Sequence, residues 1–482
     1  MVANVSHLAE HAHNRQIEQM KQIFDAQRRA FRAHPMPGAD ERISHLKRLK
    51  PALLKHMDTL IECVNQDFGS RCPSETKFAE MVTTFEAIKY HAKNVRQWMR
   101  DERRHVSMSL APAKARVMYQ PLGVVGVIVP WNYPIFLAIG PLLSALSAGN
   151  RVMIKMSEYT PKTSEAFKQM IQEIYAEDHV AVVTGEADVG VAFSKLPFDH
   201  LLFTGSTSVG RHVMRAAAEN LTPVTLELGG KSPAIIHESF PMVDAAERIS
   251  FGKCLNAGQT CVAPDYILAP RHRLDEFVTT FTDVVSSWYP TLRDNTDYTS
   301  VINARQHSRL QNYLRDAQAK GAKIIPINPA NEDFTGTHKI PITMVLNTTP
   351  DMLIEQDEIF GPLLIIKAYD SLEDAINYVN DRERPLALYY FDYNHERARY
   401  VSEHTHSGGL CINDTVSHVA ADDIPFGGVG PSGMGHYHGR EGFITFSKAK
   451  GVVEKGKFNA ARFVFPPWNR AIHNFMFKSL LK

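Results

Sequence analysis

From Gly123 onward, short apolar runs alternate with amphipathic stretches of helical period, and this alternation strongly constrains the fold. In one such stretch Val209, Val213 and Ala217 recur four residues apart. Strands that alternate with helices form a mostly parallel sheet covered on both faces, so we expect an α/β fold. Strands are expected over 124–129, 152–154, 180–183 and 201–203, and helices over 161–175, 187–195 and 207–219.

A second alternating region begins near Glu227 and continues to about residue 415, which indicates a second α/β domain. The length of 482 residues also favours two or three domains, because single cores rarely grow beyond about 300 residues. The first hundred residues are predicted to be mainly helical. Residues 106–119 predict a hairpin around Ala111-Pro112-Ala113, and the Gly-rich stretch 427–439 predicts a loop without regular structure.

Residues 121–149 carry no charge, yet four prolines interrupt them. A lipid-facing helix needs about twenty continuous residues with satisfied backbone groups. We therefore predict a buried strand, a loop and a buried helix here, and no transmembrane segment. The aromatic segment 448–482 holds eight Lys or Arg against one Glu. It leaves two interpretations open: contact with a membrane surface, or packing across a subunit interface or over the body of the protein.

Composition excludes several classes of partner. The formal net charge of +1 gives no reason to expect nucleic acid. Five scattered cysteines without Cys-x-x-Cys spacing argue against a disulfide framework or a zinc site and for a reducing compartment. The N-terminal residues contain no apolar core of a signal peptide, so we expect a cytoplasmic protein.

Cys261 ends the run Asn256-Ala257-Gly258-Gln259-Thr260-Cys261, and Glu227 lies in the strand-like stretch 224–230. A thiolate can attack a carbonyl carbon, and a nearby carboxylate can deprotonate the water that resolves the adduct. These residues are therefore candidates for a nucleophile and a base. From the residues alone, the alternative stays open that Cys261 is a small buried hydrophobe, as most single cysteines are.

Two further motifs suit a dinucleotide. The turn from Gly205 to Gly210 follows a predicted strand and opens a predicted helix, whose N-terminal N–H groups and dipole would favour a pyrophosphate. Lys155 and Glu158 follow another predicted strand, where an acidic residue can accept the hydroxyls of an adenosine ribose. The alternatives are an ordinary glycine-bounded turn and a solvated surface pair.

Five blocks of this sequence extend over most of residues 121–440: Pro130-Trp131-Asn132-Tyr133-Pro134, Phe203-Thr204-Gly205-Ser206-Thr207, Glu227-Leu228-Gly229-Gly230-Lys231-Ser232-Pro233, Gly258-Gln259-Thr260-Cys261 and Glu358-Ile359-Phe360-Gly361-Pro362. They resemble the aldehyde dehydrogenase superfamily and stand in the family's order. The stretch 425–439 is similar to the class-3-type branch, which handles aromatic and fatty aldehydes. Overall, the chain is most similar to the bacterial coniferyl aldehyde dehydrogenases.

The resemblance implies an aldehyde dehydrogenase-like fold, with a Rossmann-type cofactor domain, an α/β catalytic domain and a small oligomerisation element. Residues 1–105 and 120–228 would form the NAD(P)-binding domain with its N-terminal helices, and 229–415 the catalytic domain. The segments 106–119 and 440–482 would form the oligomerisation hairpin and C-terminal segment. By resemblance the chain is a homodimer, and the sequence alone does not decide between a dimer and a tetramer.

The resemblance also implies the cofactor, NAD, with NADP possible. Glu158 favours NAD, because its charge would repel a 2′-phosphate. Lys155 and Glu158 match the family's ribose-binding positions, and Glu358 and Phe360 match residues beside the nicotinamide ribose. The implied cofactor-binding residues are Trp131, Lys155, Glu158, Gly205, Ser206, Gly210, Leu228, Glu358 and Phe360.

For catalysis, the family match assigns Cys261 as nucleophile, Glu227 as base and Asn132 as oxyanion donor. Without the match, Asn132 would be interpreted as a turn former. The implied reaction is NAD(P)-dependent oxidation of an aldehyde, coniferaldehyde to ferulate, through a Cys261 hemithioacetal and a thioester that water hydrolyses. The alternatives are a fatty or aliphatic aldehyde, a CoA-acylating dehydrogenase, a cofactor-free thiol esterase and a protein of this fold without catalytic activity.

The substrate channel is expected to include Tyr133, Phe136 and Gly140. Gly140 falls where relatives that take small aldehydes carry a bulky residue, so it would leave room for a larger ring. His436 and His438 form a poor ligand set, and no metal is predicted.

Overall fold

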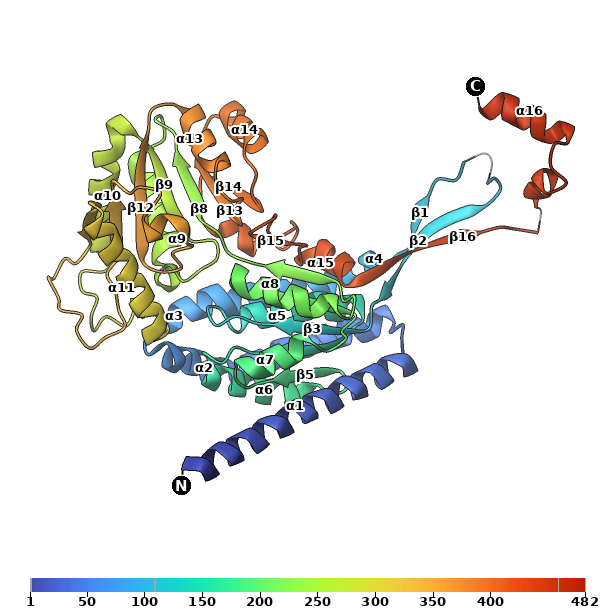
Figure 1. Ribbon diagram of the computed structural model, residues 1–482, viewed down its shortest axis with the longest axis horizontal. Coiled ribbons are helices and arrows are strands. Elements are labelled where there is room, and N and C mark those ends of the chain that lie inside the picture. The colour runs from blue at the N-terminus through green and yellow to red at the C-terminus, as the bar shows by residue number, and fades with distance from the viewer. Residues whose placement is uncertain (1, 108–109, 458, 482) are drawn as a thin grey trace.

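The computed structural model describes residues 2–107, 110–457 and 459–481, and the strands in these ranges form three sheets (Figure 1). The first sheet has the order β15-β7-β6-β3-β4-β5 and is parallel from β7 to β5, with β15 antiparallel to β7. Its strands confirm the four predicted ones. They are β3 (Val124–Ile128), β4 (Arg151–Lys155), β5 (Val180–Val183), β6 (His200–Thr204), β7 (Val224–Glu227) and β15 (Gly433–Met434).

Side chains of this sheet alternate between two hydrophobic cores, as expected for a sheet covered on both faces. Val125 and Val127 of β3 face a core that α5 shares, whereas Val124 faces a core that includes Phe24 of α1. The three predicted helices are confirmed as α6, α7 and α8. The helices around this sheet are α1 (Val2–Ala33), α2 (Ala39–Phe68), α5 (Phe136–Ala148), α6 (Pro161–Ile174), α7 (Ala187–Ser194) and α8 (Thr207–Ala218).

Helix α5 accounts for the charge-free stretch. Every residue of α5 except Gly140 is buried, so a charge on any other position would lose its hydration. The predicted order of buried strand, loop and buried helix is confirmed. In the described ranges, no helix is both long and apolar enough to cross a membrane.

The first hundred residues are mainly helical, as predicted. After α2 the chain continues through α3 (Pro73–Thr76), a π-helical turn η1 (Lys77–Val82) and α4 (Thr83–Trp98). Of these elements, α2, η1 and α4 pack beside α5. A π-helical turn is rare and frequently marks a functional site.

The second sheet has the order β10-β11-β12-β9-β8-β13-β14 and is parallel except at β10, which is antiparallel to β11. This confirms the second alternating region. The strands are β8 (Ser232–Ile236), β9 (Pro264–Pro270), β10 (Lys323–Pro326), β11 (Thr343–Leu346), β12 (Leu363–Tyr369), β13 (Ala387–Phe391) and β14 (Gly409–Ile412). Between them lie α9 (Met242–Cys254), η2 (Leu255–Gly258), η3 (Arg271–Arg273), α10 (Leu274–Trp288), α11 (Ala304–Ala319), α12 (Leu353–Gln356), α13 (Leu372–Asn380) and α14 (His395–His404), and η4 (Ser417–Ala420) follows β14.

The third sheet, β1-β2-β16, corrects the hairpin prediction. The first strand is β1 (Glu102–Arg104), which precedes the predicted range, and it pairs with β2 (Lys114–Pro121). The apolar pattern missed β1 because the strand is charged: the Glu102 carboxylate accepts hydrogen bonds from Tyr119 (2.8 Å) and Arg440 (2.6 Å). Residues 108 and 109 of the predicted hairpin lie outside the described residues.

The Gly-rich stretch 427–439 is also more ordered than predicted. Gly433 and Met434 form β15, which pairs with Leu226 and Glu227 of β7. Gly433 has φ 145°, and a Cβ there would lie 2.1 Å from the Leu226 carbonyl oxygen. Only glycine permits this approach, so the stretch gives β7 an antiparallel neighbour. Helix α15 (Gly439–Thr445) begins at its end.

Beyond α15, β16 (Ser447–Glu454) pairs along its whole length with β2. Figure 1 shows β2 and β16 extending away from the body as a ribbon, with α16 beyond their far end. The tail comprises η5 (Ala460–Val464) and α16 (Ala471–Leu480). Its aromatic side chains are exposed in the single chain: Phe463, Phe465, Trp468, Phe475 and Phe477.

Candidate active site

The candidate residues gather where parallel strands end. The loop after β3 carries Asn132, β4 leads to Lys155 and Glu158, β6 leads to Gly205, and β7 ends at Glu227. Carboxyl ends of parallel strands meet at one edge of a sheet, which is where ligands bind in open α/β folds. Cys261 lies in the loop before β9, which is a strand of the second sheet.

The backbone before Cys261 is strained. Asn256 and Ala257 have φ 51° and 50°, and Gly258 follows at 71°. Such left-handed conformations cost about 1–3 kcal/mol each for residues other than glycine and cluster at functional sites. A Cβ on Gly258 would lie 2.3 Å from the Gly361 carbonyl oxygen, so the turn also needs glycine for close approach.

The main chain of Glu227 is fixed on two sides, while its carboxyl group is not. The Gly205 N–H donates to the Glu227 carbonyl (3.0 Å), and Gly433 of β15 is the antiparallel partner of Glu227. The side chain is 3% exposed, and neither carboxyl oxygen has a hydrogen-bond partner within the described part of the chain. Burial therefore raises the pKa of Glu227 well above its usual range, which suits a base that takes up a proton.

The thiol of Cys261 lies within electrostatic reach of two carboxyl groups. Burial first, then the charges of Glu358 and Glu227, raise the pKa of Cys261 to about 12. The backbone N–H groups of Cys261 and Val262 oppose this shift. The thiol is thus protonated at neutral pH in the absence of ligand, and a base must remove its proton before attack.

Glu358, which is half-buried, is the third member of this group. Burial first, then the charge of Asp265, raise the pKa of Glu358 to about 8. A Cβ on Gly229 would lie 2.0 Å from Oε2 of Glu358, so the carboxyl group lies against the backbone just after Glu227. Gly229 thereby allows two acidic side chains to come close to one thiol.

Asn132 lies beside the Cys261 loop. Its side-chain Nδ2 donates to the Gln259 carbonyl (3.2 Å), and the neighbouring Tyr133 hydroxyl hydrogen-bonds to Thr260 Oγ1 (2.8 Å). An amide nitrogen carries two hydrogens, so one remains for a substrate oxygen. With the backbone N–H of Cys261, Asn132 can form a neutral oxyanion hole.

The turn into α8 has the features of an anion site. Ser206 caps α8 by accepting a hydrogen bond from the Val209 N–H (3.4 Å). A Cβ on Gly210 would lie 2.7 Å from Leu228 Cδ2, so this glycine lets the helix pack closely on the segment after β7. A Cβ on Gly205 would meet the Phe203 ring at 2.6 Å. The residues present therefore fit a pyrophosphate at the N-terminus of α8.

Lys155 is not the solvated surface residue of the alternative interpretation, because it is 2% exposed. Its Nζ donates to the carbonyls of Met156 (2.6 Å) and Gly185 (2.7 Å). Burial lowers the pKa of Lys155, and the nearby charge of Glu158 opposes that shift. A buried ammonium group next to a half-buried carboxylate fits paired ribose hydroxyls.

The loop that carries Glu358 and Phe360 is held in a strained conformation. Phe360 has φ 47°. Arg309 of α11 donates to the carbonyls of Ile359 (2.8 Å) and Glu358 (3.3 Å). The Phe360 ring meets Trp131 edge-on, with centroids 5.3 Å apart. This contact joins the loop to the segment that carries Asn132.

The predicted channel residues Tyr133, Phe136 and Gly140 belong to one stretch of the chain, and the Tyr437 ring packs beside it. Tyr133 and Phe136 are buried. A Cβ on Gly140 would lie 3.2 Å from Cε2 of Tyr437, so the room beside Gly140 is partly filled by this ring. The pKa of Tyr437 is raised by burial first and then by Glu227 and Cys261, which places the ring near both.

Sequence reasoning did not single out Arg71, Glu80, Arg309 or Tyr437. A signal for Tyr437 was present, because it lies within the stretch 425–439, which resembles the class-3-type branch. The other three contact site segments through residues distant in the sequence, and their own neighbours in the chain give no signal of a site.

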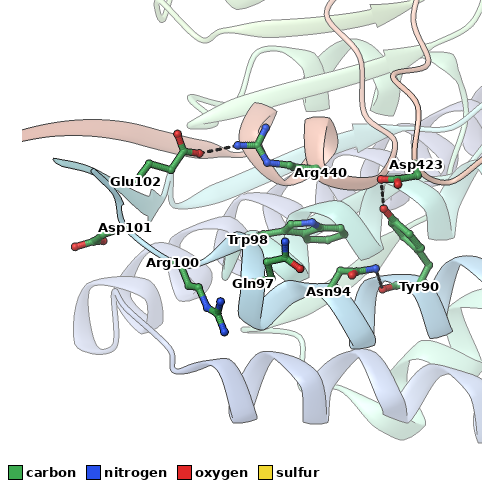
Figure 2. A pocket seen from close by; sticks show the side chains of 9 residues that line it. All are labelled: Tyr90, Asn94, Gln97, Trp98, Arg100, Asp101, Glu102, Asp423 and Arg440. Atoms are coloured by element: carbon green, nitrogen blue, oxygen red, sulfur yellow. Dashed lines mark hydrogen bonds and ion pairs between the residues drawn. The ribbon is translucent and has the colours of Figure 1, made fainter. Parts of the chain in front are cut away.

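A separate polar cavity of about 390 Å³ lies at the base of the β1-β2-β16 sheet and contains none of the predicted site residues (Figure 2). Tyr90 hydrogen-bonds to Asp423, and Arg440 pairs with Glu102 (2.6 Å). Its charges are thus partly paired with one another. The cavity is lined by Tyr90, Asn94, Gln97, Trp98, Arg100, Asp101, Glu102, Asp423 and Arg440.

Known proteins share this fold and length. The family model described as "Aldehyde dehydrogenase family" matches residues 4–452. The chain is 57% identical to a Pseudomonas aeruginosa protein named "Probable coniferyl aldehyde dehydrogenase", over 482 residues and 100% of both chains. It is 35% identical to aldehyde dehydrogenase family 3 member A2 of Rattus norvegicus, covering 92% of this chain and 88% of the relative.

Among solved structures, Mycobacterium tuberculosis aldehyde dehydrogenase complexed with NAD+ matches with a TM-score of 0.82 at 32% identity, covering 90% of each chain. The family resemblance and the fold class predicted from the motifs are confirmed.

The raised pKa of Cys261 makes a testable prediction. In cofactor-free protein, alkylation of Cys261 by iodoacetamide should accelerate about tenfold per pH unit from pH 7 to 10, because only the thiolate reacts and its pKa is about 12. Mass spectrometry of the Cys261 peptide gives the rate, and a small-molecule thiol provides the reference. A plateau below pH 9 would contradict the buried, acid-flanked environment.

Proposed function

Because this chain belongs to the aldehyde dehydrogenase family, we propose that it oxidises an aromatic aldehyde, coniferaldehyde to ferulate, with NAD or NADP as acceptor. The observation that carries the proposal is the group of half-buried Cys261 with buried Glu227 and Asn132, in which a thiol, a base and an amide donor converge. The name of the relative at 57% identity supports the aromatic substrate.

In the proposed reaction, the Cys261 thiol loses its proton to solvent, directly or by way of Glu227, and Sγ adds as a thiolate to the aldehyde carbon. Asn132 Nδ2 and the Cys261 N–H donate to the resulting oxyanion. A bound NAD(P) would supply the hydride acceptor, and loss of hydride from the adduct carbon would leave a thioester on Cys261. Glu227 then deprotonates a water, hydroxide adds to the thioester carbon, the C–S bond breaks, and Cys261 leaves as thiolate.

Two features of the residues fit these roles. An amide donor suits the oxyanion hole better than a cation, because a fixed positive charge would also retain the carboxylate product. The unpartnered carboxyl group of Glu227, with its raised pKa, favours water as the group that resolves the thioester. This argues against CoA as the acyl acceptor.

We propose that the cofactor lies along the ends of β4, β6 and β7. Lys155 and Glu158 would hold the adenosine ribose, and the α8 N-terminus with Gly205 and Ser206 the pyrophosphate. Trp131, Gly210, Leu228, Glu358 and Phe360 would complete the site toward the nicotinamide. Glu158 favours NAD over NADP through repulsion of a 2′-phosphate, and the NAD+-bound Mycobacterium tuberculosis neighbour supports this choice.

For the remaining organisation, we retain the predicted domains: 1–105 with 120–228, 229–415, and 106–119 with 440–482. The projecting β2–β16 ribbon and the exposed aromatic tail support a homodimer, because exposed apolar side chains of this density mark interfaces. Tyr133, Phe136 and Gly140 would line the substrate channel. Five free cysteines fit a reducing compartment, the cytoplasm.

The first experiment measures reduced-nicotinamide formation with NAD and with NADP on coniferaldehyde, benzaldehyde and a medium-chain aliphatic aldehyde. Turnover should be strongest with coniferaldehyde and NAD, and absent in Cys261→Ser. Cys63→Ser, which changes a half-buried thiol on α2, is the matched control and should retain activity.

Preference for the aliphatic aldehyde would keep the mechanism and discard the coniferyl assignment. Reduction that requires CoA would identify an acylating enzyme. Ester hydrolysis without any cofactor-dependent oxidation would favour the thiol esterase.

Glu227→Gln should stall the enzyme at the thioester, because an amide cannot deprotonate water. We expect a rapid burst of about one equivalent of NADH per chain, followed by a steady rate at least about 100-fold below that of the unaltered enzyme. Stopped-flow absorbance separates the two phases. Glu219→Gln, which changes a carboxylate at the end of α8, is the control. Loss of the burst itself would instead assign Glu227 to activation of the thiol.

The chain shortened to end at Val464 tests the homodimer. Light scattering should give the full chain a mass of twice 54.2 kDa, and the shortened chain should shift toward monomer at micromolar concentration, because it loses the exposed aromatic residues Phe465, Trp468, Phe475 and Phe477 of the tail. Both chains are also mixed with anionic vesicles. A membrane role would be favoured if the full chain bound vesicles, the shortened chain did not, and the shortened chain still had the mass of a dimer.

A further inference from the structure

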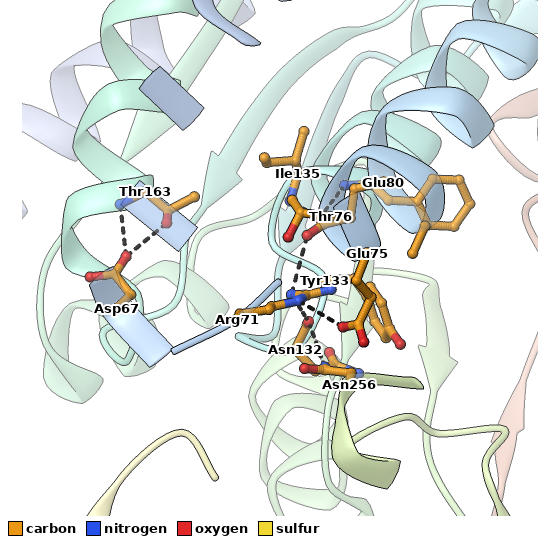
Figure 3. A network of polar contacts seen from close by, with 12 residues as sticks. Asp67, Arg71, Glu75, Thr76, Glu80, Asn132, Tyr133, Ile135, Thr163 and Asn256 are labelled. Atoms are coloured by element: carbon orange, nitrogen blue, oxygen red, sulfur yellow. Dashed lines mark hydrogen bonds and ion pairs between the residues drawn. The ribbon is translucent and has the colours of Figure 1, made fainter. Parts of the chain in front are cut away.

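A buried cluster of charged side chains lies directly behind Asn132 (Figure 3). Arg71 follows α2, Glu75 belongs to α3, and Glu80 belongs to η1. Arg71 and Glu80 are both fully buried. Buried charges are costly unless they are paired and hydrogen-bonded, so a cluster at this position calls for a specific role.

Arg71 holds the main chain of Asn132. Its Nη1 donates to the Asn132 carbonyl (2.8 Å) and lies 3.3 Å from Glu80 Oε1, while Nε donates to Glu75 (3.3 Å). The guanidinium plane also covers the Tyr133 ring, with Cζ 4.8 Å from its centroid. A second donor, Asn256 Nδ2, reaches the same Asn132 carbonyl (3.0 Å). The carbonyl is thereby fixed from both the N-terminal helices and the Cys261 loop.

Glu80 holds the other end of the same loop. Its Oε2 accepts hydrogen bonds from the N–H groups of Ile135 (2.8 Å) and Phe136 (3.1 Å), at the start of α5. These N–H groups have no partner within a helix, so Glu80 acts as the cap of α5. The π-helical turn η1 carries this carboxylate. Arg71 and Glu80 therefore fix the loop on both sides of the Asn132 side chain.

We propose that Arg71 and Glu80 are positioning residues that hold Asn132 so that its amide faces the oxygen of the Cys261 adduct. The Asn132 side chain has little else to orient it: Nδ2 donates to Gln259, and Oδ1 has no hydrogen-bond partner within residues 2–107, 110–457 and 459–481. Its direction thus follows from its backbone. The inference rests on the proposed function, in which Asn132 stabilises the oxyanion.

The planar guanidinium is essential to this geometry. Arg71 meets three acceptors at once, which a single ammonium group cannot reproduce in the same directions. Arg71→Lys keeps the charge and loses the fork. It should lower kcat about 10- to 100-fold, as expected when a catalytic group is misplaced by about 1 Å, and leave KM for aldehyde and NAD within about twofold.

The test is a double-mutant cycle of Arg71→Lys with Asn132→Ala, measured in aldehyde oxidation and in cofactor-free hydrolysis of p-nitrophenyl acetate. Ester hydrolysis uses the same thiol and oxyanion donors. If Arg71 acts through Asn132, Arg71→Lys should change the Asn132→Ala rate less than about twofold. An equal fall in both backgrounds, or no fall in either, would overturn the proposal.

Controls separate positioning from folding and from failure of the proposed function. Arg42→Lys changes another buried arginine, which donates to the carbonyls of Pro37 (3.0 Å) and Ser147 (3.0 Å) away from Asn132, and its effect on kcat should be the same in both backgrounds. If the Arg71→Lys protein does not fold, the cycle is repeated with Glu80→Gln. The amide oxygen of the substituted side chain can still accept the hydrogen bonds from the start of α5. If ester hydrolysis shows the expected coupling of Arg71→Lys with Asn132→Ala but the unaltered protein oxidises no aldehyde, only the proposed function is overturned. Loss of both reactions in the unaltered protein would overturn both proposals.

Discussion

Parallel pairing of β3, β6 and β7 is the constraint on which the candidate site depends. The register aligns Thr204 with Glu227, and the Gly205 N–H then donates to the Glu227 carbonyl (3.0 Å). The turn proposed for the pyrophosphate and the proposed base are therefore adjacent because two strands end together. A slip of one residue would turn Glu227 to the opposite face of the sheet.

The buried acidic groups around Asn132 and around Cys261 differ in their partners. Around Asn132, burial raises the pKa of Glu75 and of Glu80, and the charge of Arg71, which pairs with both, opposes that rise. Around Cys261, burial likewise raises the pKa of Glu227 and of Glu358, and neither forms an ion pair with a Lys or Arg of the described residues. The paired cluster fixes the Asn132 loop, and the carboxyl groups at Cys261 retain the capacity to exchange protons.

Local patterns made much of the fold predictable. Strands β3 to β6 are short apolar runs, and α6 to α8 show helical periodicity, so neither depends on distant partners for recognition. Cys261, Glu227 and Asn132 stand in compact motifs and were accessible for the same reason. The catalytic roles that the family resemblance assigns to these three residues remain predictions.

The rest could not be predicted because its cause is non-local. Arg71 contacts a carbonyl 61 residues away, and Glu80 an N–H 55 residues away. In sequence, Arg71 stands in a short turn between two helices and Glu80 in a charged helical stretch, and neither position points to Asn132. Strand β1 was missed because its charged residues pair with β2 without an apolar face, and β15 because glycines become a strand only when β7 lies alongside.

The contact between Gly140 and Tyr437 makes two distant positions one steric unit. A side chain added at 140 meets the Tyr437 ring at 3.2 Å, so the volume at one position limits the volume at the other. Interiors at this density tolerate compensating changes better than single ones. Substitutions at these two positions should therefore be interdependent: a larger residue at 140 becomes acceptable when 437 is reduced, and evolution of pocket size would proceed through paired replacements.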